Sequence, residues 1–537
     1  MKKLYLISFL IICVFISANA QKKLFTIAES SNYKSTSTYN DVIDFINTLD
    51  NTADNMRIEY FATSTEGRDI PLMIIGSPLP EKPENLINDD RVIVYIQANI
   101  HAGEVEGKEA VLMLARDLLG GKDDEVLENV VLLICPIFNP DGNEKFSLKN
   151  RTNQNGPING VGIRYNGQML DINRDAMKVE TPEMKGVITQ ILNKWDPDVS
   201  VDCHTTNGSF HEEPITFTWM NNPNTDRSLI NFMRDNMMPK VSKTLHEIYN
   251  VENIFYGEFV DRLNYERGWI SYAAEPRYLV NYIGVRNRLS ILNENYVYAD
   301  FKTRVWGCYY LLKSILEFSS DNYTEISQLL EQADQYTISK ATDISVIDSF
   351  AIEYSGKPTP EKITIKAFET DTIPGVKGYW RYKKSDRKVT VTIPYIADYF
   401  STKSVRFPYA YILSIPDKDV LNLLKTHGIK IEQLSENKTI NVERFKIEEL
   451  KPSNRINQGH YTNRVKGKFI EETKEFPSGT YFVKTTQKLG NLAAYLLEPQ
   501  ADDGLLKWNY FDKFLVPQWG SGYFPYPVYR VIEETEL

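Results

Sequence analysis

The chain has few cysteines and no excess of positive charge. It contains four cysteines in 537 residues, and one of them, Cys13, lies in the apolar stretch at the start of the chain. Cys135, Cys203 and Cys308 are an odd number without close spacing, so they predict no disulfide framework, although a single bridge stays open. The formal net charge is −10, and the sequence contains no basic patch. The sequence therefore predicts no nucleic-acid partner.

Long hydrophobic runs are absent after the N-terminus. Residues 1–20 have the pattern of a bacterial secretory signal peptide: two lysines precede an apolar stretch at 4–16, and a small-residue cleavage site ends at Ala20. The apolar stretch is too short for a transmembrane helix, and no second one follows it. We therefore expect a secreted or periplasmic protein, cleaved after Ala20, without stable membrane insertion.

The two halves of the chain differ in pattern. Apolar runs that alternate with stretches of helical periodicity occur at 91–100, 129–138, 199–203 and 289–292. This alternation predicts a mixed, mostly parallel α/β sheet flanked by helices. After about residue 345 the pattern changes to alternating strands, without internal repeats, low-complexity tracts or a metal-ligand cluster. We expect a catalytic domain at 21–340 and a β-rich C-terminal domain of unknown role at 341–537.

Side chains that suit a metal site follow three of the apolar runs. His101 lies just past the first run, with Glu104 three residues later. His204 follows the third run and Glu294 the fourth. Because ligands gather beyond the carboxyl ends of parallel strands, we expect these side chains on one edge of the sheet. Two imidazoles and one carboxylate are the ligand number of a catalytic zinc, which keeps a position open for water.

Each of these residues has a structural explanation when it is taken alone. His101 can be a hydrogen-bonded histidine at a helix entry, where Glu104 favours the positive end of the helix dipole. Asp202 and His204 alternate onto one strand face and can form a buried ion pair, and Glu294 can be a strand-end carboxylate. Together these explanations require a coincidence at every position, so the pattern favours the metal site.

The remaining histidines predict no chemistry. His211 lies in a stretch that has the composition of a solvated loop, and His246 belongs to the polar face of a helical stretch. His427 and His460 have no ligand-like neighbours.

The motifs resemble those of the zinc carboxypeptidases of the carboxypeptidase A family. The resemblance spans roughly residues 25–320. Its landmarks, in chain order, are Ser64 to Arg68, His101 with Glu104, Asn139 to Gly142, Asp171 to Arg174, His204 and Glu294. It implies one Zn²⁺ per chain, with His101, Glu104 and His204 as ligands. It also implies that Asp171 orients the first histidine.

The same resemblance implies how the reaction proceeds. Glu294 corresponds to the general base that takes a proton from water. An arginine assists the developing oxyanion, and here Arg151 is favoured over its competitor Arg164 because it lies in the loop after the Asn139 to Gly142 turn.

The resemblance also implies how the substrate is held. Asn173 and Arg174 bind its terminal carboxylate, since a planar guanidinium binds a carboxylate through two hydrogen bonds. Among Tyr272, Tyr278 and Tyr282, Tyr272 best fits the spacing of the tyrosine that closes over family substrates. The chain departs from the family after Arg174, where Asp175 is expected to add a negative charge beside the carboxylate-binding residues.

We therefore expect a secreted zinc metallocarboxypeptidase acting on peptides. Cleavage of cell-wall peptides, which end in a diaminopimelate or D-amino-acid carboxylate, is the alternative. Amide hydrolases of acylated amino acids share the metal site but are compact and cytoplasmic, so the predicted signal peptide disfavours them. A binding protein on a degenerate scaffold is disfavoured because the three ligand candidates and Glu294 are all present. The oligomeric state is not predicted.

Overall fold

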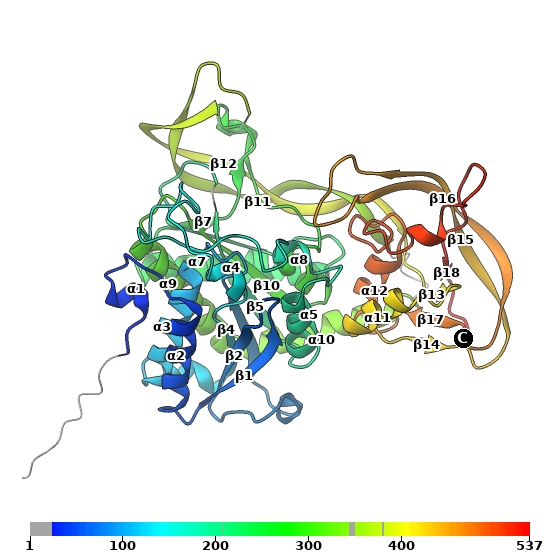
Figure 1. Cartoon of the computed structure of the whole chain (residues 1–537), viewed down its shortest axis with the longest axis horizontal. Coiled ribbons are helices and arrows are strands. Elements are labelled where there is room, and N and C mark those ends of the chain that lie inside the picture. Colours follow the sequence, from blue (N-terminus) through cyan, green and yellow to red (C-terminus); the bar gives the residue numbers. More distant parts are fainter. Residues whose placement is uncertain (1–23, 207, 343–348, 379–380) are drawn as a thin grey trace, which may run out of the picture.

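The computed structural model describes residues 24–206, 208–342, 349–378 and 381–537 (Figure 1). The predicted signal peptide at 1–20 lies outside this part of the chain. Within the described ranges no helix combines the length and the apolar character needed to cross a membrane.

An eight-stranded mixed sheet forms the centre of the catalytic half, in the order β1-β2-β4-β3-β5-β10-β6-β7. The strands are β1 (Met56–Thr63), β2 (Asp69–Ile75), β3 (Val92–Ala98), β4 (Val130–Cys135), β5 (Val199–Thr206), β6 (Ile215–Trp219), β7 (Asn253–Phe255) and β10 (Leu289–Tyr296). The central strands β4, β3, β5 and β10 run parallel. Every residue of β3, β4 and β5 is buried, which is typical of parallel strands covered on both faces. The predicted mixed, mostly parallel sheet is confirmed.

Alternate residues of β3 belong to two different hydrophobic cores. Val94 and Ile96 pack into the core that contains α2 (Tyr39–Asp50), α3 (Glu106–Leu119) and α9 (Phe301–Asp321). Ile93 and Tyr95 pack into a second core with α5 (Pro182–Gly186) and α8 (Leu279–Val285). Further helices of the catalytic half are α1 (Ile27–Ser30), α4 (Pro140–Asn143), α6 (Arg227–Phe232), α7 (Met238–Glu247) and α10 (Tyr323–Ser339). Helices therefore cover both faces of the sheet, as the period-2 alternation of its side chains requires.

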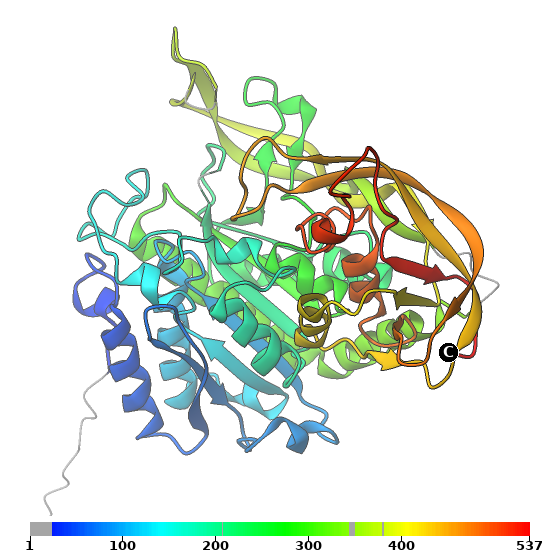
Figure 2. The same ribbon diagram turned by 45° about the vertical axis from the view of Figure 1, so that its right-hand side comes forward.

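A long two-stranded ribbon projects from the body (Figures 1 and 2). It consists of β11 (Ser349–Thr372) and β12 (Tyr382–Arg406). These strands join β9 (Trp269–Ile270) and β8 (Glu258–Phe259) in a four-stranded sheet of order β11-β12-β9-β8. The two halves of the chain therefore share a sheet, on either side of the boundary predicted at residue 340.

The last part of the chain, residues 407–537, forms what we call the C-terminal module. Its six-stranded sheet has the order β14-β17-β13-β18-β15-β16. The strands are β13 (Ala410–Leu413), β14 (Glu432–Gln433), β15 (Lys438–Pro452), β16 (Asn463–Phe476), β17 (Tyr481–Lys484) and β18 (Val528–Val531), and the helices are α11 (Lys418–Thr426) and α12 (Gly490–Leu497). The predicted β-rich character is confirmed. All of α12 except its first two residues packs into the second hydrophobic core together with α8, so the module and the catalytic half share one core.

Candidate active site

The parallel strands bring the candidate ligands to one edge of the sheet. His101 and Glu104 occupy the turn between β3 and α3, where the Glu104 N–H donates to the His101 carbonyl at 2.8 Å. His204 lies in β5, and Glu294 is its register partner on the neighbouring strand β10. Both strands run past the ends predicted for them at 203 and 292. The sheet register therefore places Glu294 directly beside the histidine.

The three candidate ligands form a compact, buried triangle. His101 Nδ1 lies 3.1 Å from His204 Nδ1, and Glu104 Oε2 lies 3.2 Å from the first nitrogen and 3.0 Å from the second. Within the described residues this is the one His/Cys/Asp/Glu group whose ligand atoms all lie within 4.8 Å of one another. Zinc binds nitrogen and oxygen at about 2.0–2.2 Å, so a single ion reaches all three atoms. The donor set fits Zn²⁺.

Each histidine also contacts an aspartate through Nε2, the ring nitrogen that is not part of the triangle. His101 Nε2 lies 3.0 Å from Asp171 Oδ1, and His204 Nε2 lies 2.9 Å from Asp202 Oδ2. A carboxylate in this position fixes the tautomer of the imidazole and directs the other nitrogen toward a metal. The Asp202–His204 ion pair weighed from the sequence as an alternative to ligation is present, and it is compatible with ligation.

The electrostatics of the triangle favour an additional positive charge. Burial opposes protonation of His204, but Asp202 and Glu104 outweigh it and raise the pKa of the imidazole well above its usual value. Burial also opposes ionisation of Glu104, yet His101 and Arg151 hold the pKa of this carboxyl well below its usual value. A buried carboxylate must be compensated by a cation, which a divalent metal supplies.

The pKa of Glu294 is shifted from the acidic range toward neutral pH. The side chain is half-buried and lines the same cavity as the triangle. Burial raises the pKa of Glu294 to about 8, with Glu104 acting in the same direction and the positive groups His204, Arg164 and Arg151 opposing it. A carboxylate with a raised pKa binds a proton more strongly, as general-base catalysis requires.

Both candidate oxyanion arginines line the cavity. Arg151 bonds three protein groups: Nη1 donates to Glu104 at 3.0 Å, Nη2 to the Thr205 carbonyl at 2.9 Å and Nε to Gln154 at 2.7 Å. Arg164 Nε donates to Asp171 at 2.8 Å, and its Nη1 lies 3.2 Å from His101 Nδ1. Arg151 stays a prediction, since Arg164 lies as close to the ligand atoms.

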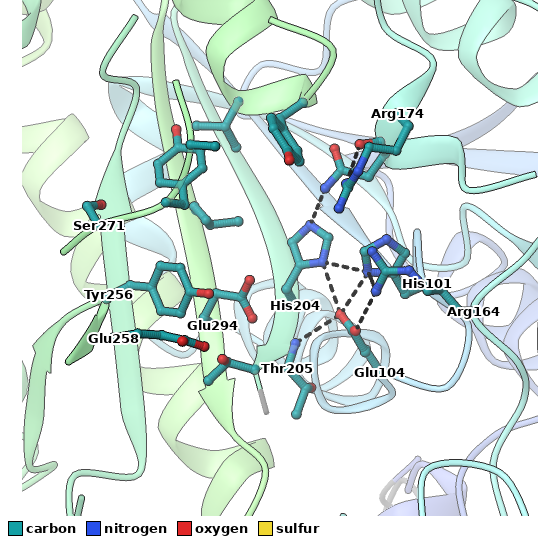
Figure 3. A pocket seen from close by; sticks show the side chains of 18 of the residues that line it. His101, Glu104, Arg164, Arg174, His204, Thr205, Tyr256, Glu258, Ser271 and Glu294 are labelled. Carbon is teal, nitrogen blue, oxygen red and sulfur yellow. Dashed lines mark hydrogen bonds and ion pairs between the residues drawn. The ribbon is translucent and has the colours of Figure 1, made fainter. Parts of the chain in front are cut away.

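Asn173 and Arg174, the candidate carboxylate-binding residues, line the same cavity, which has a volume of about 450 Å³ (Figure 3). The Arg174 guanidinium stacks on the ring of Tyr278, 4.3 Å from the ring centre, and Nη1 donates to the Asn173 carbonyl at 2.7 Å. Asn173 Oδ1 accepts a hydrogen bond from Leu279 N at 3.0 Å, and its Nδ2 lies 3.3 Å from His204 Nε2. Asn173 thus connects the loop that carries Arg174 to α8 and to a metal-ligand candidate.

Asp175 does not add charge to the cavity, so that prediction is wrong. The carboxylate is fully buried and lies outside the cavity lining. It accepts hydrogen bonds from Lys178 Nζ at 2.7 Å and from both the backbone N–H and the hydroxyl of Thr181, at 2.8 Å and 2.7 Å. Lys178 neutralises the carboxylate, and Asp175 organises the turn that follows Arg174.

The three tyrosines weighed from the sequence occupy different environments. Tyr272 lines the cavity, but its hydroxyl donates to the Trp219 carbonyl at 3.3 Å. Tyr278 lies under Arg174. Tyr282 is buried outside the cavity lining and bonds His427 Nδ1 at 2.7 Å.

Tyr256 and Glu258 also line the cavity and were missed by the sequence analysis. Burial raises the pKa of Tyr256 well above its usual value, as does the nearby Glu294. Glu258 lies in the short strand β8, and Arg262 Nη2 is 3.7 Å from its carboxylate. In the view of Figure 3, His204 and Glu294 lie between Arg174 and Glu258. No motif marks these residues, since they enter the site through the β7–β9 region.

The motif residues that lie outside the cavity form hydrogen bonds that stabilise the loops around it. Asp141 accepts hydrogen bonds from the Ser64 hydroxyl at 2.7 Å, the Glu66 N–H at 2.9 Å and Arg68 Nη1 at 2.7 Å. Asn139 Nδ2 donates to the carbonyl that precedes His101 at 3.2 Å. The turn predicted at Asn139 to Gly142 is the start of the short helix α4, capped by the Asn139 side chain.

The other histidines lie outside the cavity. The predicted solvated loop at His211 is wrong: the ring is buried, stacks on Tyr296 at 3.9 Å and lies beside Ala367 of the ribbon. The ribbon covers this segment, which local composition cannot indicate. His246 is exposed on α7, as predicted.

The fold and the cavity define a class of protein. A buried His–Glu–His group beside a carboxylate base, at the carboxyl edge of a parallel sheet, is the arrangement of a mononuclear zinc hydrolase.

Comparison with known proteins shows which family the chain resembles. Residues 42–275 match the family model of the zinc carboxypeptidases, peptidase M14. The matched segment includes the three candidate ligands His101, Glu104 and His204, so this part of the chain is similar to a zinc carboxypeptidase domain. Carboxypeptidase 2 of Trichophyton tonsurans is 24% identical over 489 residues, which cover 87% of this chain and 81% of the relative. Carboxypeptidase 2 of Trichophyton rubrum is 23% identical over 463 residues, with coverages of 83% and 78%.

Some solved structures that resemble the chain are also named as carboxypeptidases. A metallo-carboxypeptidase from Burkholderia cenocepacia has 16% sequence identity and a TM-score of 0.39, covering 53% of this chain and 70% of that chain. The carboxypeptidase A from Helicoverpa armigera has 16% identity and a TM-score of 0.39, with coverages of 54% and 75%.

Proposed function

We propose that the protein is a secreted zinc metallocarboxypeptidase that hydrolyses the C-terminal peptide bond of peptides. The observation that carries this proposal is that one cavity is lined by the His101–Glu104–His204 group, by Glu294 and by the stacked guanidinium of Arg174. Hydrolysis needs the first two, and recognition of a chain end needs the third. Secretion rests on the pattern of residues 1–20.

One Zn²⁺ per chain would be held by His101 Nδ1, Glu104 and His204 Nδ1, with Asp171 and Asp202 behind the two imidazoles. When bound, the ion supplies a Lewis acid and a water of lowered pKa.

The side chains of the cavity perform the proton transfer and stabilise charge. Glu294 accepts the proton of the attacking water and returns it to the leaving nitrogen, a role that its raised pKa supports. Arg151 is the proposed partner of the developing oxyanion, with Arg164 as the competing residue.

Arg174 and Asn173 form the proposed carboxylate clamp. Stacking on Tyr278 leaves the in-plane N–H groups of the guanidinium at its edge, where a carboxylate binds through two hydrogen bonds. Tyr272, which lines the same cavity, is the proposed tyrosine that closes over the substrate.

Cell-wall peptides are a second candidate substrate, and Glu258 favours them. Its side chain lines the cavity and is 47% exposed, so the carboxylate is accessible to an amino group such as the one on diaminopimelate.

The first experiment combines the zinc content of the purified protein with amino-acid release from a mixed pool of plain peptides and from cell-wall peptides. We expect one zinc per chain and chelator-sensitive release from plain peptides. Release from cell-wall peptides alone would move the assignment to the second candidate. Bound zinc without release from either pool would contradict both.

Arg174→Ala tests the clamp. Loss of a charged hydrogen bond costs about 1.5–3 kcal/mol, so KM should rise about 10- to 100-fold while kcat changes less. An unchanged KM would contradict the clamp assignment.

A further inference from the structure

The carboxylate clamp is built on two loops, and the C-terminal module contacts both. We call these the clamp loops: residues 171–181, which carry Asn173 and Arg174, and residues 275–279, which carry Tyr278. The two loops contact each other through the Arg174–Tyr278 stack and through the Leu279 N–H, which donates to Asn173 Oδ1. Any displacement of one loop therefore moves the guanidinium relative to the cavity.

The first clamp loop is held at both ends. Gln458, in the β15–β16 connection of the module, accepts a hydrogen bond from Asp171 N at 2.9 Å. Asp171 is the residue whose side chain holds His101, two positions before Asn173. Near the other end of the loop, His460 Nε2 lies 2.7 Å from Glu180 Oε1. In addition, the Tyr510 hydroxyl donates to the Lys178 carbonyl at 2.9 Å.

The second clamp loop is held by Asp503. This carboxylate is fully buried, and its Oδ2 accepts hydrogen bonds from Arg277 N at 2.9 Å and from Arg277 Nε at 3.0 Å. The bond to the main chain fixes the backbone of residue 277, and the ion pair fixes the direction of its side chain. Tyr278 is the next residue, and its ring supports Arg174.

Because Asp503 is buried, its ion pair with Arg277 is costly to break. A carboxylate removed from water must be paired, and removing one partner of a buried pair leaves an uncompensated charge. Both clamp loops consist mainly of turns and irregular backbone, so little secondary structure restrains them. Recognition of a carboxylate by a guanidinium requires positioning to a fraction of an ångström. Contacts from outside the loops are therefore needed to supply that precision.

We propose that the C-terminal module is a positioning element of the substrate site, in which Asp503 and Gln458 hold the two clamp loops where Arg174 binds the terminal carboxylate. This inference rests on the proposed role of Arg174. Asp503 and Gln458 act through other residues and are not cavity-lining groups.

The test uses the full chain and compares Asp503→Asn and Gln458→Ala with Glu498→Gln. Glu498 is a matched control: it belongs to the same module, is fully buried and is paired with Arg530, and its bonds to Tyr411 and Arg530 stay within the module. For each variant, kcat and KM are measured on a peptide with a free terminal carboxylate and on the same peptide with a terminal amide. Zinc content is measured alongside.

We expect Asp503→Asn to raise KM for the free carboxylate about tenfold, with kcat and zinc content little changed, and Gln458→Ala to raise KM by a smaller factor. KM for the amide should not change, because the amide lacks the charge that Arg174 binds. In the double variant with Arg174→Ala, the Asp503→Asn effect should disappear, since residues that act through one another are not additive.

Three outcomes would overturn the inference. Glu498→Gln could raise KM as much as Asp503→Asn does, which would indicate general destabilisation of the module. The Asp503→Asn effect could persist in the Arg174→Ala background. Alternatively, Arg174→Ala could raise KM while Asp503→Asn and Gln458→Ala keep the wild-type value, which would overturn the module's role and leave the clamp intact.

The failure of the proposed function has a different signature. If Arg174→Ala itself leaves KM unchanged, the clamp assignment fails and the inference fails with it. Should Asp503→Asn not fold, Gln458→Ala carries the same test, because this half-buried side chain lies in a loop between two strands.

Discussion

At the candidate metal end of the cavity the side chains come from the ends of β3, β5 and β10, whereas at the proposed carboxylate-binding end they come from the two clamp loops. Backbone hydrogen bonds of the parallel sheet fix the first end, since Glu294 is the register partner of His204. Gln458 and Asp503, hundreds of residues later in the chain, hold the second.

The two ends of the cavity therefore differ in how much they depend on the C-terminal module. The metal end is built mainly within the catalytic half, where the sheet and its helices bury every residue of β3 and β5, although Gln458 of the module bonds the main chain of Asp171 behind His101. The clamp end depends on a module that shares a hydrophobic core with α8. Changes at the metal end should therefore affect chemistry and metal affinity, and changes at the module interface should affect substrate binding and stability.

The largest expected effect is that of Glu294→Gln. Removing a general base lowers rates by about 10²–10⁴-fold, so kcat should fall by this factor while zinc content stays at the wild-type value. Steady-state kinetics and metal analysis measure the two quantities. Glu258→Gln, the same change in the same cavity, is the control and should keep its turnover of neutral peptides. Zinc loss in Glu294→Gln would show that the residue belongs to the metal group.

Asp202→Asn tests whether the carboxylate that contacts His204 contributes to metal affinity. Loss of a carboxylate behind a ligand histidine weakens metal binding about 10- to 100-fold, which a competitive chelator titration measures. Asp198→Asn is the control: this carboxylate precedes β5 and accepts from Ile93 N at 2.7 Å. Equal affinities in the two variants would contradict the role assigned to Asp202.

The module interface should weaken in acid because of His427. Burial lowers the pKa of His427 from 6.5 to about 3, and Arg286 acts in the same direction. Between these values the unfolded chain binds a proton that the folded chain does not, so stability is complete above pH 6.5 and falls as the pH decreases. The loss should be about 2 kcal/mol between pH 8 and pH 5.

Chemical unfolding at several pH values measures this slope in the wild type and in His427→Gln. The variant lacks the titrating group, so its stability should depend less on pH in this window. Identical slopes in both proteins would contradict the assignment.

The smallest effect is expected for His460→Ala. The contribution of His460 to stability should change with pH in the opposite direction to that of His427. The hydrogen bond to Glu180 raises the pKa of His460 above 6.5. The pair therefore stabilises the fold below pH 6.5 and loses its contribution as the pH rises through the higher folded value. The pair is partly exposed, so its contribution should stay below about 1 kcal/mol. A variant that loses stability at pH 8.5 and not at pH 5.5 would reverse the predicted sign.

Much of the central sheet was predictable because its evidence is local. Four apolar runs that alternate with helical stretches predicted parallel strands, and the residues that follow them predicted which side chains meet. The predictions for Asp175 and His211 were wrong for one shared reason. Each side chain is buried by groups outside its immediate neighbours, Asp175 by the turn that includes Lys178 and Thr181, and His211 by Tyr296 and the ribbon.

The amino-acid sequence by itself predicted the candidate metal ligands, the candidate base and the sheet edge on which they lie, because each apolar run marks a buried strand and these polar residues follow the runs. Only the tertiary structure decided that Glu258 enters the cavity and that Gln458 and Asp503 hold the clamp loops. These contacts join segments whose separation along the chain leaves no periodic signal. They form only when the two halves bury their shared core.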